Sequence, residues 1–148
     1  MRVSAKSRYA LAALTTMAMQ EDSGECVTVI SISEHLGISK IYLEQVFSLL
    51  KRAKLVTSVK GAQGGYRLSR GASSITVLDV LRAMEGSLFE ETGPSSGAGA
   101  AYIDKALQSE VYCPLDTALK EALQKISVLS LAKAAGKEKG GDTLMFYI

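Results

Sequence analysis

The chain has 148 residues, of which 47% are hydrophobic and 22% charged, and its formal net charge is +2. This length suffices for one compact domain with a short extension, and the composition excludes wholesale disorder. No stretch approaches the roughly 18 apolar residues that span a bilayer, and no secretory signal is visible. The two cysteines are too few for a disulfide framework. We therefore expect a soluble, cytoplasmic protein.

Positive charge is concentrated in the first half of the chain. Residues 1–70 carry ten lysines or arginines against five acidic residues, a balance of +5, whereas residues 71–148 have a balance of −3. A basic front half on a nearly neutral chain indicates a local patch for a polyanion, although charged runs are usually only solvated faces.

Two helices are predicted at the start of the chain. Residues 4–19 contain few helix breakers, and their apolar residues recur near helical spacing. Residues 26–29 can form a short extended segment. A second, short helix is expected to open at Ser31, because Ser31 and Glu34 match a capping box, and to end at Gly37.

The third predicted helix has two different faces. Ser39 is a natural N-cap for it. Apolar residues at 43, 46, 47 and 50 fall on one side and are expected to be buried. The opposite side points outward and carries Ile41, Gln45, Ser48 and Arg52, with Glu44 at its edge.

A hairpin and a further helix follow. Residues 55–59 and 65–69 are short β-type runs, and the glycine-rich segment 60–64 between them is typical of a hairpin turn. Thr76 and Asp79 match a capping box that opens a fourth helix, which is expected to stop before residue 86.

The second half contains a linker, a longer helix and a tail. Residues 90–100 are a loop or linker by composition. A longer helix is expected to begin at Pro114, since proline suits the first helical position. A polar, glycine-containing spacer at 136–142 then leads to an apolar end. One face of the longer helix presents Leu115, Leu119, Ala122 and Ile126.

These elements predict an α+β, mostly helical fold whose residues 1–86 form a winged helix-turn-helix. The major groove of B-DNA, about 12 Å wide, admits one helix. Gln45 can bond adenine, Glu44 can accept from cytosine and Ile41 can pack on a thymine methyl group. By periodicity alone, an unrelated α+β domain with three helices and a hairpin is an equal alternative. The cations expected to neutralise phosphates are Lys6, Arg8, Lys51, Arg52, Lys54 and Lys60.

Four motifs in combination resemble the Rrf2 family of bacterial transcription regulators. They are S-x-K-x-R-Y-A at 4–10, Y-L-E-Q at 42–45, L-V-x-S-V-K-G at 55–61 and G-G-Y-x-L at 64–68. The resemblance implies a winged helix-turn-helix with a long C-terminal dimerisation helix at about 114–127, and a homodimer on a pseudo-palindromic operator. It also implies a layout of DNA-binding domain 1–86, linker 87–101, dimerisation helices 102–135 and flexible tail 136–148.

The expected contacts follow from the motifs and this resemblance together. Glu44, Gln45 and Lys60 match the family's DNA contacts, and Tyr42, Lys6 and Arg8 match them more loosely. Ile41 replaces the small polar residue that some members have there, which leaves the target sequence open. The full set of expected DNA contacts is Lys6, Arg8, Ile41, Tyr42, Glu44, Gln45, Ser48, Arg52, Lys60, Gly61 and Gly64, and the expected dimer contacts are Leu115, Leu119, Ala122 and Ile126.

Family members that hold an iron–sulfur cluster have three clustered cysteines after the winged domain, whereas this chain has only Cys113 there. One thiolate without a nearby histidine cannot hold a cluster within a monomer, so we predict no cofactor and no metal. Cys113 and Cys26 are expected to be partly buried, inert thiols, and His35 an ordinary packing or surface residue. Nothing in the sequence indicates a catalytic site, so we expect no enzyme.

The chain ends in an apolar segment with two interpretations. On physical grounds alone, a terminal strand packed on its own domain is favoured. However, the last four residues resemble the C-terminus of family members that repress cysteine-metabolism genes, whose tail is thought to enter the active site of cysteine synthase. The resemblance therefore implies partner binding by Met145, Phe146, Tyr147 and Ile148.

The leading hypothesis is a homodimeric repressor of cysteine or sulfur metabolism genes that receives its signal when cysteine synthase binds the tail. Two alternatives stay open. One is a regulator of the same family that senses redox or nitrosative stress through Cys113. The other is an adaptor whose main role is to inhibit cysteine synthase.

Overall fold

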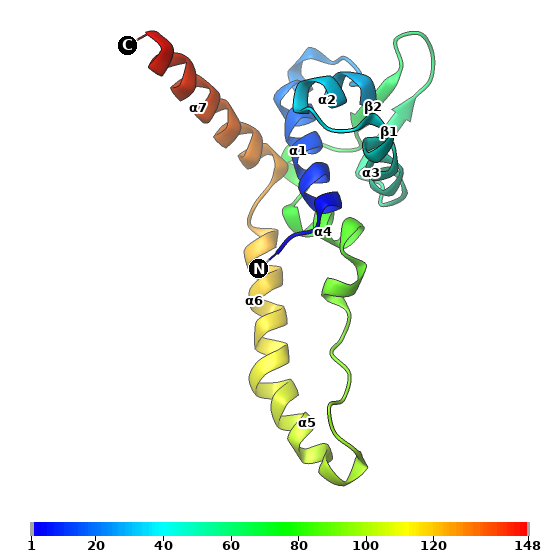
Figure 1. Cartoon of the computed structure of the whole chain (residues 1–148), viewed down its shortest axis with the longest axis vertical. Helices are drawn as coiled ribbons and strands as arrows, with labels where there is room; N and C mark the ends of the chain where they lie inside the picture. Colours follow the sequence, from blue (N-terminus) through cyan, green and yellow to red (C-terminus); the bar gives the residue numbers. More distant parts are fainter. Residues whose placement is uncertain (1, 148) are drawn as a thin grey trace.

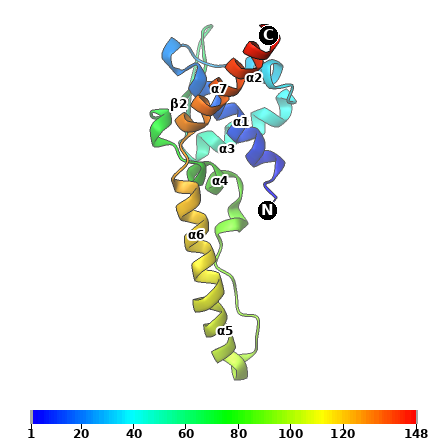
Figure 2. The same cartoon turned by 90° about the vertical axis from the view of Figure 1, so that its left-hand side faces the viewer.

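A helical body and a long arm make up the computed structural model (Figure 1). It describes residues 2–147, with side chains described as far as residue 141. The body contains α1 (Ala5–Met19), α2 (Val29–Leu36), α3 (Lys40–Arg52), β1 (Val56–Val59), β2 (Gly65–Leu68) and α4 (Val77–Met84). The arm is formed by α5 (Ala101–Leu107) and α6 (Cys113–Gln124), and α7 (Val128–Tyr147) returns to the body and lies across α1 (Figure 2).

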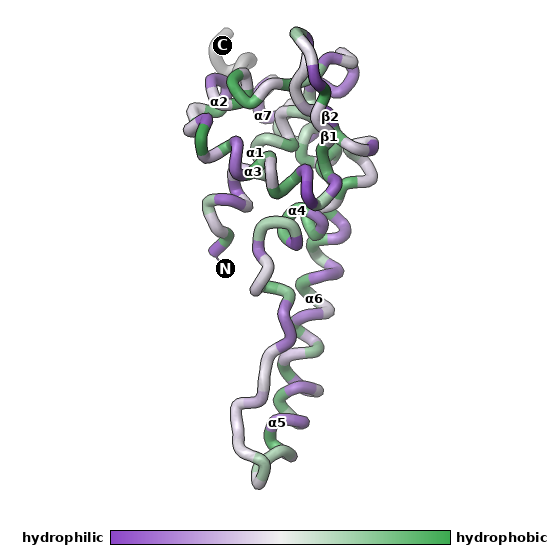
Figure 3. Tube along the Cα trace, turned by 90° about the vertical axis from the view of Figure 1, so that its right-hand side faces the viewer, coloured by the Kyte–Doolittle hydropathy of each residue, from purple (hydrophilic) through white to green (hydrophobic). Residues whose placement is uncertain are grey.

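The core lies where α1, α3, α4 and the start of α7 meet. Small residues along α1, among them Ala10 and Ala13, let neighbouring helices approach closely, and both are fully buried. Val128 and Ala132 of α7 belong to the same apolar cluster. The tube in Figure 3 shows hydrophobic and hydrophilic residues in alternation along α5 and α6, so the arm is amphipathic. Among the described residues, no helix has the length and apolar content needed to cross a membrane.

Three of the predicted helix ends can be compared with the observed ones. The capping box at Thr76 and Asp79 is confirmed: each side chain accepts a hydrogen bond from the other residue's N–H. The box predicted at Ser31 is wrong, because α2 begins three residues earlier. Thr28 is its N-cap and accepts from the Ser31 N–H at 3.1 Å. Gly37 ends α2 as predicted, in a left-handed conformation with φ of 65°.

A pair of hydrogen bonds outside α2 determines where this helix begins. The Val27 N–H donates to the Tyr66 carbonyl at 2.9 Å, and the Tyr66 N–H donates back at 2.8 Å. This bridge ties the residue before Thr28 to the wing, so the chain turns into helix immediately afterwards. Residues 26–29 are therefore extended only at the bridge, and Val29 is already helical.

The longer helix begins earlier than its predicted start at Pro114. The helix runs from Ala101 through a π-type turn at 108–112 into α6, and it ends at Gln124 instead of Ser127. The prediction of a start at Pro114 is wrong because the wider π-type turn precedes the proline. Such a turn relieves the clash that a proline ring makes with the carbonyl one turn earlier.

The segment 136–142, predicted as a spacer before the tail, is helical instead, because α7 continues to Tyr147. Residues 128–135 already form helix, and the lysines and glutamate of this stretch are good helix formers, so the helix continues through its glycines. Residue 148 and the side chains of 142–147 lie outside the description, and the four residues expected to bind a partner fall among them.

Candidate nucleic-acid interface

The two faces of α3 differ as the sequence predicts. Leu43, Val46, Phe47 and Leu50 are fully buried, whereas the opposite face is open. Ile41 is 71% exposed, and its apolar side chain faces solvent on a helix whose buried face already fills the core. The other exposed residues of this face are Glu44, Gln45, Ser48 and Arg52.

Glu44 has an intramolecular partner that the sequence analysis did not identify. The Lys40 ammonium lies 3.6 Å from Glu44 Oε1, one turn earlier on α3, and both side chains are about half exposed. An exposed pair of this kind contributes little stability, so the carboxylate can leave it at small cost. The Glu44 carboxylate can therefore accept a hydrogen bond from a DNA base. In the protein without DNA, the Lys40 ammonium partly balances its charge.

Tyr42 differs from its neighbours because it is half-buried. Its ring meets the ring of Tyr9 edge-on, with centroids 5.1 Å apart and planes at 86°. This contact joins α3 to the first turns of α1. Tyr42 thus fixes the position of α3 relative to α1.

The wing is a two-stranded antiparallel hairpin in which Val56 pairs with Leu68 and Val59 pairs with Gly65. Lys60 is exposed at the start of its turn. Gly61 has a φ of 113°, a conformation that L side chains rarely adopt, and its carbonyl accepts from the Gly64 N–H at 3.0 Å. The turn therefore needs glycine for its shape.

The wing is attached rigidly to α3 and to the segment before α2. The rings of Phe47 and Tyr66 lie 4.7 Å apart, which packs β2 on the buried face of α3. Gly65 lies so close to the Val27 carbonyl that an added Cβ would be 2.6 Å from its oxygen. The lysine of the wing and the outward face of α3 are thus presented by one rigid unit.

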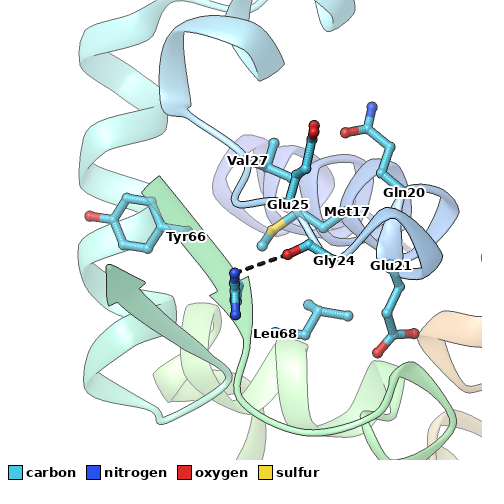
Figure 4. A pocket seen from close by; sticks show the side chains of 9 residues that line it. Met17, Gln20, Glu21, Gly24, Glu25, Val27, Tyr66 and Leu68 are labelled. Atoms are coloured by element: carbon cyan, nitrogen blue, oxygen red, sulfur yellow. Dashed lines mark hydrogen bonds between the residues drawn. The ribbon is translucent and has the colours of Figure 1, made fainter. Parts of the chain in front are cut away.

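Behind the wing lies a cavity of about 220 Å³, between the end of α1 and β2 (Figure 4). Met17 and Leu68 form part of its apolar lining. The Arg67 guanidinium donates to the Gly24 carbonyl at 2.9 Å and to Cys26 Sγ at 3.2 Å. Arg67 therefore braces the wing against the α1–α2 connection.

The first turn of α1 supplies two of the expected cations, with Lys6 half-buried and Arg8 exposed. Ser4 caps this helix. Its N–H donates to Glu85 Oε1 at 2.9 Å, and the Ser7 hydroxyl donates to the same oxygen at 2.8 Å. Hydrogen bonds from Ser4 and Ser7, with a smaller effect of the Lys6 charge, hold the pKa of the Glu85 carboxyl below its usual value.

Three further cations, Lys51, Arg52 and Lys54, are exposed at the end of α3 and in the turn after it. Lys54 has a φ of 60°, the left-handed conformation that ends many helices. Together with Lys60 and the first turn of α1, these residues give the body several cations that can meet phosphates on either side of α3.

The expected dimer contacts lie in different surroundings. Leu115 is 64% exposed on the arm, and Ala122 is also exposed. Leu119 packs on its own α4 beside Leu78 and Leu81. Ile126 lies beyond α6, where its carbonyl accepts from the Val77 N–H at 2.8 Å. The apolar residues of the arm that the sequence analysis missed are Tyr102, Ile103 and Val111, all exposed.

Cys26 is half-buried, as expected, whereas Cys113 is exposed and its sulfur accepts from the Gln108 amide at 3.4 Å. The expectation of a partly buried Cys113 is therefore wrong, because the arm leaves this face of α6 uncovered. Within the described part of the chain, no three or more His, Cys, Asp or Glu side chains gather closely enough to hold a metal ion.

A helix with an open polar face, a preceding short helix and a rigidly attached basic wing define a winged helix-turn-helix regulator that binds DNA. The comparison with protein families agrees. Residues 3–134 match the Rrf2 family, described as "Iron-dependent Transcriptional regulator". The chain belongs to the Rrf2 family and is a transcription regulator, not an enzyme.

Relatives with two different names are similar to this chain. The regulator IscR of Escherichia coli is 38% identical over 128 residues, covering 86% of this chain and 78% of that protein. The solved structure of CymR, "the Global Cysteine Regulator of B. subtilis", has a TM-score of 0.74 at 28% identity, covering 90% of this chain and 98% of that one. The solved structure of T. potens IscR has a TM-score of 0.69 at 33% identity, covering 91% of this chain and 88% of that one.

The family description raises the question of an iron site. Cys113 is the one cysteine of the arm, and Cys26 lies on the body beside Arg67. An iron–sulfur cluster requires several thiolate or imidazole ligands at one place. The described residues do not offer such a set, so they do not fit a cluster held by one chain.

Proposed function

We propose that this chain is a homodimeric repressor of cysteine or sulfur metabolism genes that reads its operator with α3 and the wing. The observation that carries the DNA-binding part is the rigid unit of α3 and wing, with Glu44, Gln45 and Lys60 exposed on it. Base contacts by Gln45 and Glu44 would give sequence preference, and Lys60 would add a phosphate contact.

The arm supports a homodimer. Leu115 and Tyr102 are 64% and 71% exposed, and with Ile103 and Val111 they leave several large apolar side chains of the arm open to solvent. A second copy packed along α5 and α6 would bury them. Two-fold symmetry would then place two α3 helices about one turn of B-DNA apart, roughly 34–36 Å, so the operator should be a pseudo-palindrome.

The similarity to the B. subtilis cysteine regulator supports control of cysteine metabolism, as does the Met-Phe-Tyr-Ile end of the chain. In this proposal the segment 145–148 enters the active site of cysteine synthase. Phe146 and Tyr147 add apolar burial. The family description, "Iron-dependent Transcriptional regulator", points to iron as another signal, but the described residues do not fit a cluster held by one chain.

The signal would follow from thermodynamic coupling. Cysteine synthase would stabilise the DNA-competent dimer, and a serine-derived metabolite that competes for the enzyme's site would release it. Coupling of this kind is reciprocal, so operator DNA should tighten the binding of the enzyme by the same factor.

A pull-down with purified cysteine synthase tests the signalling part. The intact chain should retain the enzyme, and a chain that ends at Thr143 should not. Equal retention by both would contradict the role of the tail, and retention by neither would remove the enzyme from the proposal.

The exposure of Cys113 favours one alternative, a regulator of the same family that responds to oxidants. In that case peroxide should weaken DNA binding by the intact chain and leave a Cys113→Ser variant unaffected. A variant that carries both Gln45→Ala and Lys60→Ala distinguishes the adaptor hypothesis from the repressor hypothesis. This variant should lose DNA binding and keep the enzyme if both activities are real.

A further inference from the structure

A carboxylate at the end of α4 holds the first turn of α1. Oε1 of Glu85 accepts two hydrogen bonds, from the Ser4 N–H and from the Ser7 hydroxyl. The Ser4 hydroxyl in turn accepts from the Ser7 N–H at 3.2 Å and lies 3.3 Å from Ser7 Oγ. Ser7 is fully buried, so its hydroxyl needs this acceptor inside the protein. The carboxylate also lies at the positive end of the α1 dipole.

The turn that Glu85 holds carries Lys6 and Arg8, which the proposed function assigns to phosphate contacts. The Lys6 charge is close enough to act on the Glu85 carboxyl. The first turn of a helix frays when nothing ties it down, and a frayed turn would spread both cations over many positions. The Glu85 junction therefore limits where Lys6 and Arg8 can meet a phosphate.

Glu85 is also the first residue after α4, where the chain leaves for the arm. At its other end α4 is bonded to the junction between α6 and α7, because the Val77 N–H donates to the Ile126 carbonyl. A second bond, from the Val128 N–H to the Ile75 carbonyl at 2.8 Å, reinforces that junction. Figure 1 shows α4 between the arm and α1. The bonds of Glu85 join the end of α4 to α1, and the bond from Val77 joins its start to the connection between α6 and α7.

We propose that Glu85 is a positioning residue for DNA binding. It fixes the first turn of α1 for phosphate contact by Lys6 and Arg8 and couples that turn, through α4, to the arm. This inference rests on the proposed DNA-binding function.

Two effects of the Glu85 carboxylate on DNA binding have opposite signs, which makes the inference testable. Its negative charge repels phosphates, so charge removal alone should strengthen binding. Its acceptor oxygen positions two cations, so loss of the acceptor should weaken binding. Glu85→Gln removes the charge but keeps an acceptor oxygen, whereas Glu85→Ala removes both. Glu90→Ala is the matched control, because it removes a charge from an exposed side chain five residues away.

The probe is a duplex that the intact chain enriches from a random-sequence library, and affinity is measured between 50 and 200 mM salt. We expect Glu85→Ala to lower affinity on the order of tenfold, and to reduce the slope of log affinity against log salt by about 0.9 for each lost phosphate contact. Glu85→Gln and Glu90→Ala should bind as tightly as the intact chain or more tightly. A loss of stability alone lowers the fraction of folded protein, which urea unfolding measures. It does not change the salt slope of DNA binding by the protein that stays folded.

Unchanged or tighter binding by Glu85→Ala would overturn the inference, and so would an equal loss in Glu85→Gln. If Glu85→Ala does not fold, Ser7→Ala takes its place, because it removes one of the two donors and should cause a smaller loss with the same sign. Failure of the intact chain to enrich any duplex would instead contradict the proposed function.

Discussion

The ring of Tyr66 in the wing lies 4.7 Å from the ring of Phe47, which is fully buried in α3. This contact makes the exposed face of α3 and the tip of the wing parts of one rigid surface. A regulator that reads bases with one element and phosphates with the other needs such a fixed relation, since both must fit the same duplex at once.

Loss of that ring contact should loosen the wing. We expect Tyr66→Leu to lower the free energy of unfolding by about 1 kcal/mol, the typical value of an aromatic pair, and to weaken DNA binding. Tyr66→Phe keeps the ring and should behave as the intact chain in both respects. Urea unfolding and a DNA titration measure the two effects. If both variants behaved alike, the ring contact would have no role in holding the wing.

The close approach of the wing to the residue before α2 predicts a second effect. Gly65 has a φ of 154°, and an added Cβ would lie 2.6 Å from the Val27 carbonyl oxygen. Gly65→Ala should therefore cost about 1–3 kcal/mol from backbone strain alone, and more from the clash. Gly71→Ala is the control, because the nearest atom to its Cβ would be 3.9 Å away. Thermal unfolding of the two variants should differ clearly, and equal stability would contradict this account of β2.

Lys54 stores strain at the end of α3. Its φ of 60° lies in the left-handed region, which is unfavourable for most side chains, lysine included, by about 1 kcal/mol. Lys54→Gly should raise the free energy of unfolding by up to that amount and reduce the salt slope of DNA binding by about 0.9. Lys54→Ala provides the comparison, since it removes the charge and keeps the strain. A Lys54→Gly variant no more stable than Lys54→Ala would refute the strain argument.

The arm should control the oligomeric state. Leu115→Glu places a charge on the face that a second copy would bury, so we expect a monomer in light scattering and weaker binding to a palindromic duplex. Thr117→Glu adds the same charge to an exposed residue two positions along α6, on another side of the helix. It should remain dimeric. A dimer in both variants would mean that the interface lies elsewhere.

Acid should destabilise the protein through Glu85. The pKa of this carboxyl is lowered in the folded state by the bonds from Ser4 and Ser7. The unfolded chain therefore takes up the proton first as the pH falls. The stabilisation is complete above the pKa that the carboxyl has in the unfolded chain, and it is lost as the pH falls through the lower pKa of the folded state. Urea unfolding from pH 6 to pH 3 should show a smaller loss for Glu85→Gln than for the intact chain, and identical curves would exclude the effect.

The local patterns of the chain predict much of the body. Helical spacing separates the buried face of α3, at Leu43 and Phe47, from its open face at Gln45. The glycine-rich turn between two β-type runs predicts the wing, and the capping box at Thr76 predicts the start of α4. Each of these features depends on residues that are close together in the sequence, so the sequence alone is sufficient.

The missed features depend on contacts between distant residues or on opposing local preferences. The bond from the Ser4 N–H to Glu85 joins residues 81 positions apart, and no local pattern marks it. The start of α2 at Val29 follows from the bridge between Val27 and Tyr66. Pro114 suggested a helix start, but the π-type turn before it lets the helix continue from Ala101.

The intact chain is expected to bind DNA with sequence preference through α3 and the wing, and enrichment of a duplex from a random-sequence library measures this preference. The intact chain should select a pseudo-palindromic duplex. The Gln45→Ala variant should bind that duplex more weakly by about 1–3 kcal/mol while its affinity for unselected DNA stays the same. Enrichment of no common sequence, or equal affinity of the Gln45→Ala variant for the selected duplex, would contradict the claim.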